Sequence, residues 1–143
     1  EGLKMRFQGK LCSEGKFWLA EVPVFDAMTQ GRTRREALDM IADWFVTMAN
    51  RKGFCVDIHP AGNDEFEVSS ADARTMVSLL LRRQRQKSGL SLAQAAQRLG
   101  AKSRNAYARY ERGASVPTVE KLDELLRAVA PGRDIVLQQS AAA

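Results

Sequence analysis

Apolar and polar residues near the start of the chain follow the pattern of strands with one buried face. Apolar side chains alternate along residues 17–22, and a second extended run precedes them. The two runs flank Ser13-Glu14-Gly15, where the glycine favours a turn. The pattern predicts a β-hairpin within residues 3–25, and Pro23 favours a bend or a sheet edge at its end.

A helix with a single apolar stripe is predicted over residues 33–53. Thr33 and Glu36 have the spacing of a capping box, and Gly53 is suited to the end of the helix. Between them, apolar residues recur at the spacing that one buried helix face requires. The predicted stripe consists of Ala37, Met40, Ile41, Trp44, Phe45 and Met48.

Two further extended segments complete the first half of the chain. Residues 54–58 are predicted to return as a strand, and residues 65–68 form a short edge strand after a turn at Asn63-Asp64. We therefore expect a small sheet covered by one helix in residues 1–70, in the order β-β-α-β.

The second half has the pattern of helices joined by short links. Polar small residues at 69–72 mark the boundary, and glycines at 89, 100 and 113 end successive helices. The predicted helices cover residues 72–89, 91–100, 103–113 and 117–129. The fold class is therefore α+β, with a first domain at 1–70, an all-helical domain of four to five helices at 71–133 and a tail at 134–143. Residues 133–139 of this last part could pair with their copy as a dimerisation strand.

The charge of the chain is divided unevenly between these halves. Residues 1–70 carry nine Lys and Arg against eleven Asp and Glu, whereas residues 71–143 carry thirteen against six. A basic surface of this kind favours a polyanionic partner such as nucleic acid, and a merely solvated basic face is the alternative.

Composition also excludes several classes of protein. No apolar run is long enough to span a membrane and no signal peptide is recognisable, so we expect a cytoplasmic protein without membrane contact. The two cysteines, Cys12 and Cys55, lack metal-site spacing and are expected to be buried free thiols. We predict no metal ion and no cofactor.

Two short helices around a glycine are what a helix-turn-helix requires. Ala95 and Ala96 are small enough for a close helix crossing, and Tyr107 and Tyr110 would pack the next helix inward.

With the tyrosines inward, Arg104, Asn105, Ala108 and Arg109 are expected on the exposed side. Arginine and asparagine can make bidentate contacts to guanine and adenine. Phosphate contacts are assigned to Lys102, Ser103, Gln94 and Arg112, although ordinary solvation explains Lys102 and Arg112 equally well.

Residues 81–126 resemble the Cro/C1 (Xre) helix-turn-helix family, and the likeness covers most of residues 73–130. The matching motifs are "GLS" at 89–91, "LG" at 99–100, "ERG" at 111–113 and Pro117. The resemblance implies that Arg104, Asn105 and Arg109 read bases and that Arg85 pairs with Glu111. Two departures are Leu92, where the family commonly has glutamine, and a "GAKS" turn that is one residue longer than usual.

Residues 17–41, "FWLAEVPVFDAMTQGRTRREALDMI", are similar to the HicB antitoxins. That resemblance implies a partial RNase H-like domain that binds and blocks a HicA-like mRNA-cleaving toxin, followed by a DNA-binding domain that represses the operon. The segment "PVFDAM" departs from the family's usual "PDLPGC". The acidic balance of residues 1–70 is consistent with a basic partner.

An RNase H-like outline also raises the hypothesis of a two-metal nuclease. Its candidate ligands are Asp26, Asp39, Asp43 and Asp57, for which a solvated helix face or loop is the more ordinary explanation. The single histidine, His59, has no neighbour in sequence to form a catalytic pair and is expected at the surface. We therefore predict no enzyme activity and no catalytic residues.

The sequence as a whole predicts an antitoxin of a type II toxin–antitoxin system. It would bind a palindromic operator as a homodimer or higher oligomer, because one short helix offers few base contacts. The alternative is a solitary helix-turn-helix regulator whose first domain senses a ligand or another protein.

Overall fold

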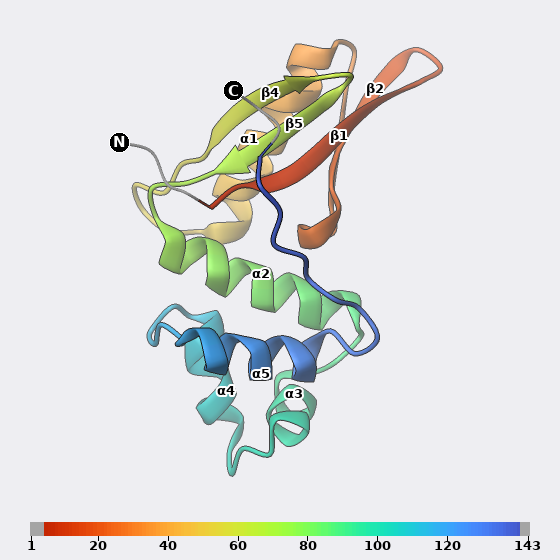
Figure 1. Cartoon of the computed structure of the whole chain (residues 1–143). Helices are drawn as coiled ribbons and strands as arrows, with labels where there is room; N and C mark the ends of the chain where they lie inside the picture. The colour runs from red at the N-terminus through yellow and green to blue at the C-terminus, as the bar shows by residue number, and fades with distance from the viewer. Residues whose placement is uncertain (1–4, 141–143) are drawn as a thin grey trace. The chain divides into compact units, whose positions relative to one another are not determined.

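The computed structural model describes residues 5–140 (Figure 1). The first residues of the expected hairpin, 3 and 4, and the last three of the expected tail, 141–143, lie outside this range. The described chain divides into two compact units. The first contains the residues up to Ala73 together with those from Leu137 onward, and the second is Arg74–Val136.

The first unit is built on an antiparallel sheet of five strands. In spatial order the strands are β3, β2, β1, β5 and β4, and each neighbouring pair is antiparallel. Their bounds are β1 Phe7–Glu14, β2 Phe17–Val22, β3 Ala27–Gly31, β4 Asp57–Gly62 and β5 Glu65–Ser69. With the helical unit that follows, this sheet confirms the predicted α+β class.

Three details of the sheet differ from the sequence prediction. Ala27–Gly31, for which the sequence predicts no strand, forms one, because β2 pairs with it along its whole length. The segment 65–68 is not an edge strand, since β5 lies between β1 and β4. The fourth strand begins at Asp57 rather than at residue 54. The pairing of β5 with β1 brings together residues distant in sequence, such as Phe7 and Val68, and local composition does not encode it.

Helix α1, Arg34–Ala49, covers one face of the sheet (Figure 1). Thr33 caps it by accepting a hydrogen bond from the Glu36 N–H at 3.0 Å. Its buried residues are Ala37, Ile41 and Phe45. Met40, predicted to be in the stripe, is 45% exposed because it lies at the solvent margin of the helix.

Beneath α1 the sheet has a layer of aromatic side chains. Phe25, in the turn between β2 and β3, meets both Phe7 and Phe45 edge to face with ring centroids 4.9 Å apart. Offset contacts of this kind favour aromatic packing beyond simple burial. The cysteines, by contrast, are both exposed, so the prediction that they are buried was wrong. Cys12 falls on the sheet face that α1 does not cover.

Strand β3 is held close to α1 by two contacts. The Thr29 hydroxyl donates a hydrogen bond of 2.9 Å to the Ala37 carbonyl. A Cβ atom placed on Gly31 would lie 2.4 Å from the Ala37 nitrogen, which is backbone and cannot rotate away. Only glycine therefore permits this approach of strand and helix.

The second unit contains four helices. These are α2 Ala73–Lys87, α3 Leu92–Leu99, α4 Arg104–Glu111 and α5 Val119–Val129. Their core consists of Leu81, Ala95, Ala96, Tyr107, Tyr110, Leu125 and Val129. No helix within residues 5–140 is both long and apolar enough to cross a bilayer.

An ion pair between Arg85 and Glu111 joins the first and third of these helices. The Arg85 Nε and Nη2 atoms donate to the two carboxylate oxygens of Glu111 at 2.6 and 3.0 Å. Its Nη1 atom donates to the Leu90 carbonyl at 2.8 Å, in the link between α2 and α3. The hydrogen bonds that Arg85 donates to Glu111 raise the pKa of Arg85, and the pair is nearly enclosed. A bidentate pair of this geometry fixes both position and orientation.

Replacing Gly31 with alanine should destabilise the first unit by about 3 kcal/mol, because the new methyl group meets backbone. Both tryptophans of the chain, Trp18 and Trp44, lie in this unit, so their fluorescence during urea unfolding measures the loss. Gly15→Ala is the control: no atom lies near its added methyl, and the left-handed backbone alone costs about 1 kcal/mol. Equal losses in both variants would contradict this account of Gly31.

Replacing Glu111 with alanine should destabilise the helical unit by about 3–5 kcal/mol, since it leaves Arg85 enclosed without its counter-charge. Circular dichroism at the helix band measures this loss, while tryptophan fluorescence of the first unit should stay unchanged. Asp123→Ala, which breaks an exposed pair with Arg127 on α5, is the matched control and should cost less than about 1 kcal/mol. A small loss for Glu111→Ala would show that the pair contributes little.

Candidate nucleic-acid interface

The surface with the chemistry for nucleic acid is formed by α3, α4 and the link between them. Helix α3 begins with a complete capping box: the Ser91 hydroxyl accepts from the Gln94 N–H at 3.0 Å, and the Gln94 side chain accepts from the Ser91 N–H at 2.8 Å. It ends at Gly100, whose backbone is left-handed with φ of 78°. Both ends of this short helix are therefore fixed by local hydrogen bonds.

Helix α4 starts after a link of residues 100–103. Ser103 caps it, accepting a hydrogen bond from the Ala106 N–H at 3.3 Å. Tyr107 is fully buried and Tyr110 is 7% exposed, against Ala95 and Ala96 of α3 in the same core. Burial raises the pKa of Tyr107, and the neighbouring Glu111 carboxylate raises it further. The tyrosines therefore determine which side of α4 faces outward.

The outward side of α4 carries three of the residues predicted to read bases. Arg104, Asn105 and Arg109 are all exposed. Ala108, however, is only 6% exposed, so its predicted place on the exposed side was wrong. It neighbours Tyr107 along the helix, and the side of α4 that packs inward is wide enough to include both.

Two of these exposed side chains are held by neighbours, one on α4 and one at the residue that caps its C-terminal end. The Arg112 guanidinium donates to the Asn105 amide oxygen at 2.9 Å. Arg109 lies over the Tyr110 ring at 5.0 Å from its centroid and donates to the Tyr110 hydroxyl at 3.3 Å. These contacts restrict the side chains and so reduce the entropy lost when they meet a ligand.

The residues assigned to phosphate contact lie around the same surface. Lys102, Ser103, Gln94 and Arg112 are all exposed. The Gln94 and Ser103 oxygens are already acceptors in the two helix caps, so their remaining donor hydrogens are what they can offer to phosphate. The start of α4 adds backbone N–H groups and a partial positive charge.

Three other arginines of this unit donate hydrogen bonds to groups of the same unit. The sequence did not predict this role. Arg98 donates to the Ala128 carbonyl at the end of α5 at 2.7 Å, and Arg74 donates to the Gly113 carbonyl after α4 at 3.0 Å. Arg133 donates to the side chains of Gln84 and Ser88 at 3.1 and 2.7 Å. An arginine near a helix end is the only sequence signal for such a role.

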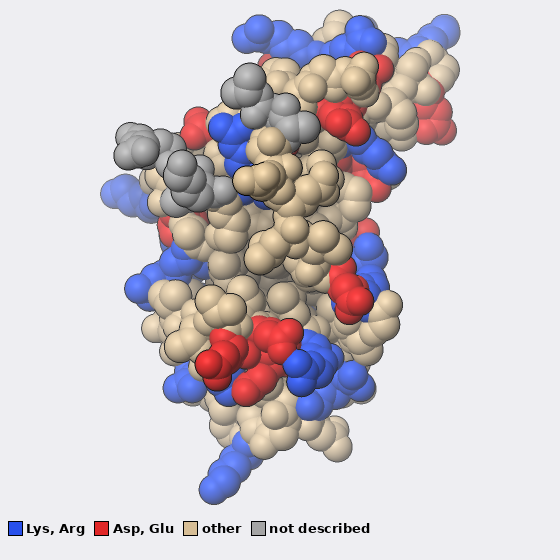
Figure 2. Space-filling view, in the orientation of Figure 1, with Lys and Arg blue, Asp and Glu red and all other residues tan. Residues whose placement is uncertain are grey.

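The acidic residues of the helical unit gather elsewhere. Glu120, Asp123 and Glu124 lie exposed on α5, where Figure 2 shows a red patch beside a blue one. Lys121 and Arg127 pair with Glu124 and Asp123 within this patch. Phosphate would be repelled here, so the charge distribution favours the α3–α4 side for a polyanion.

The four aspartates that were candidate metal ligands of a nuclease do not form a metal site. Asp26, Asp39, Asp43 and Asp57 lie exposed on different parts of the first unit, and within residues 5–140 no three His, Cys, Asp or Glu side chains form a potential metal site. The His59 Nε2 atom lies 2.7 Å from the Ser69 hydroxyl, a neighbouring-strand contact.

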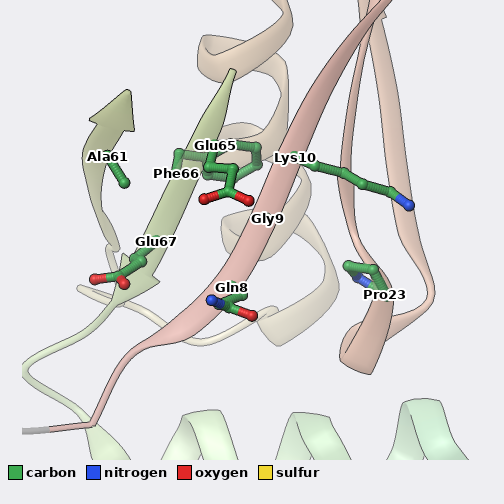
Figure 3. A pocket seen from close by; sticks show the side chains of 8 residues that line it. All are labelled: Gln8, Gly9, Lys10, Pro23, Ala61, Glu65, Phe66 and Glu67. Atoms are coloured by element: carbon green, nitrogen blue, oxygen red, sulfur yellow. The ribbon is translucent and has the colours of Figure 1, made fainter. Parts of the chain in front are cut away.

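The sheet has a small hollow beside β1 and β5 (Figure 3). Gln8, Lys10, Glu65 and Glu67 line it among others. Glu67 already accepts from Arg6 at 3.1 Å and from the Ser140 hydroxyl at 2.5 Å. With this carboxylate engaged, the hollow offers few polar groups that converge on a small molecule.

Comparison with known protein families supports the geometry of the second unit. Residues 81–129 match the family model described as Helix-turn-helix, which spans less than half of the chain. A search of curated proteins found no match to the chain. The matched segment starts in α2, includes the whole of α3 and α4, and ends at the last residue of α5. Residues 81–129 are therefore a Cro/C1-type helix-turn-helix domain, and the chain carries the DNA-binding module of a transcriptional regulator.

Proposed function

We propose that this chain is an antitoxin that also represses transcription. In this proposal the helical unit binds a palindromic operator, and the sheet unit binds a HicA-like mRNA-cleaving toxin. The observation that carries the DNA-binding part is the orientation of α4, whose buried tyrosines turn Arg104, Asn105 and Arg109 outward.

Helix α4 would enter the major groove of DNA. There the Arg104 guanidinium is suited to the two acceptors of guanine, and the Asn105 amide to adenine. Asn105 is exposed but bonded to Arg112, so base contact requires Arg112 to release it. Arg112 would then be available for the phosphate backbone, in line with the role proposed for it.

A dimer is proposed because α4 is short. Its eight residues can reach only a few base pairs. Two copies on half-sites about 34 Å apart would double the contacts and match a palindromic operator. The tail at 134–140 forms no strand within the chain, so the proposed pairing of residues 133–139 requires a second copy.

The toxin-binding part rests on the resemblance of residues 17–41 to the HicB antitoxins. A separate compact unit with its own aromatic core supports a second binding role beside DNA. The alternative, a solitary regulator with a ligand-sensing first unit, would need a site with converging polar groups. The hollow of Figure 3 has one enclosed carboxylate that is already bonded.

Arg104→Ala should weaken operator binding by about 1–3 kcal/mol and relax the preference for one base pair. Lys102→Ala should weaken binding to every sequence about equally and reduce the salt dependence, as expected for a phosphate contact. Fluorescence anisotropy with operator and scrambled duplexes at several salt concentrations measures both. Arg127→Ala, an exposed arginine on the acidic α5, is the control and should bind like the unaltered chain. If Arg104→Ala lost affinity equally on both duplexes, the base-reading role would be rejected.

Co-expression tests the antitoxin role. If the gene beside the one for this chain encodes a small basic protein, producing that protein alone should arrest growth and cause mRNA degradation. Producing the full chain with it should prevent both effects. Arg104→Ala should still neutralise it, because this residue is assigned to DNA alone. If the neighbouring product is harmless or does not bind, the solitary-regulator alternative is favoured.

A further inference from the structure

The sheet of the first unit has one face that α1 does not cover. Thr29 and Gly31 face α1, as their contacts with Ala37 show. Because side chains alternate along a strand, Met28 and Gln30 face the opposite side. Residues paired directly across neighbouring strands lie on the same face. Met28 of β3 pairs with Glu21 of β2, which pairs with Lys10 of β1. In the same way Gln30 pairs with Leu19, which pairs with Cys12. We call this side the outer face.

The β1–β3 part of the outer face has an apolar centre. Met28 is 55% exposed and Phe17 is 41% exposed, and the partly exposed Leu19 is the alternate neighbour of Phe17 on β2. Cys12 lies opposite Leu19. Apolar side chains gathered in this way on neighbouring strands mark a contact surface more often than scattered ones do.

Carboxylates surround this centre. The strand residues of the outer face include Glu14 and Glu21 near the apolar centre and Asp57, Glu65 and Glu67 on the far strands, against one lysine, Lys10. Glu67 is bonded to Arg6 and to Ser140 of the tail, which lies on the β5 side. The accessible part is therefore the β1–β3 side, where Glu14 and Glu21 against Lys10 leave an excess of one carboxylate.

The two edge strands, β4 and β3, differ in how readily they could pair with a further strand. Strand β4 contains Pro60, and its register with β5 shifts between Pro60 and Gly62, two devices that discourage a further strand. Strand β3, at the other edge, has neither proline nor charge in its five residues. The edge that can accept a partner backbone thus adjoins the apolar centre.

We propose that the β1–β3 outer face is the surface that binds the partner protein, and that the partner presents Arg and Lys around an apolar anchor. The anchor would pack on Phe17, Leu19 and Met28, and the cations would face Glu14 and Glu21. This inference rests on the proposed function, because it identifies the site at which the toxin would bind.

The chemistry of the face argues against other occupants. Nucleic acid would place phosphates beside carboxylates. The outer face of a second copy would oppose like charges, which costs free energy. A basic protein surface satisfies both the charge and the apolar centre, and complementary charge would also raise the association rate.

The test measures the affinity of the full chain for the purified basic protein encoded beside it. Met28→Lys should weaken the complex by at least about tenfold, because it places a cation at the centre of the contact. Met40→Lys is the matched control: it is the same change at a similarly exposed methionine, but on α1 at the other face. Its affinity should equal that of the unaltered chain. Glu14→Lys should slow association and reduce its salt dependence.

Operator affinity and tryptophan-monitored unfolding should be unchanged in all three variants, which excludes misfolding as the cause. If the unaltered chain forms no complex, the toxin-binding role fails and this inference fails with it. If the complex forms and Met28→Lys and Glu14→Lys bind like Met40→Lys, the antitoxin role stands and the outer face is rejected. If Met28→Lys changes only the oligomer mass, the face joins two copies of the chain, which also overturns the proposal.

Discussion

The enclosed pair between Arg85 and Glu111 is the interaction on which the geometry of the helical unit depends. One guanidinium binds both carboxylate oxygens at the end of α4 and the carbonyl of the link before α3. It therefore connects three segments, and the hydrogen bonds from the Leu90 N–H to the Arg85 carbonyl and from Arg74 to the Gly113 carbonyl add to these connections. Because α4 has eight residues, it is too short to be stable alone. Its orientation is set by this pair at one end and by the Ser103 cap at the other, with Tyr107 buried between them.

The arginines of the helical unit have two different roles. Its excess of arginine is not one basic surface. Arg85, Arg98 and Arg74 bind carboxylate or carbonyl oxygens within the fold, whereas Arg104 and Arg109 are exposed on α4. Three exposed acidic residues, Glu120, Asp123 and Glu124, lie on α5. The outward side of α4 thus carries arginine without a neighbouring carboxylate patch like that of α5, and charge placed in this way favours association with DNA.

In the sheet unit the corresponding constraint is the close approach of β3 to α1 at Gly31. It commits one face of the sheet to the core and so leaves Phe17, Leu19 and Met28 on the other face, which we propose binds a partner. The two units thus present surfaces of opposite character: basic and polar on α4, acidic with an apolar centre on β1–β3. A regulator that binds DNA and a basic protein needs two surfaces of this kind, so that neither ligand competes for the other's site.

The sequence by itself determined the helices and the helix-turn-helix, because capping residues, glycine stops and apolar spacing act within a few residues of one another. The Ser91–Gln94 capping box and the left-handed Gly100 are of this local kind. Only the tertiary structure decided that Ala27–Gly31 is a strand, that β5 lies inside the sheet and that Ala108 is buried. It also showed that Arg74 and Arg98 bind backbone carbonyls of the same unit, whereas Arg104 and Arg109 lie on the outward side of α4. The place of β5 depends on pairing between residues far apart in the chain, such as Phe7 with Val68, and the burial of Ala108 depends on how wide a side of α4 packs inward. Neither is contained in the pattern of a local window.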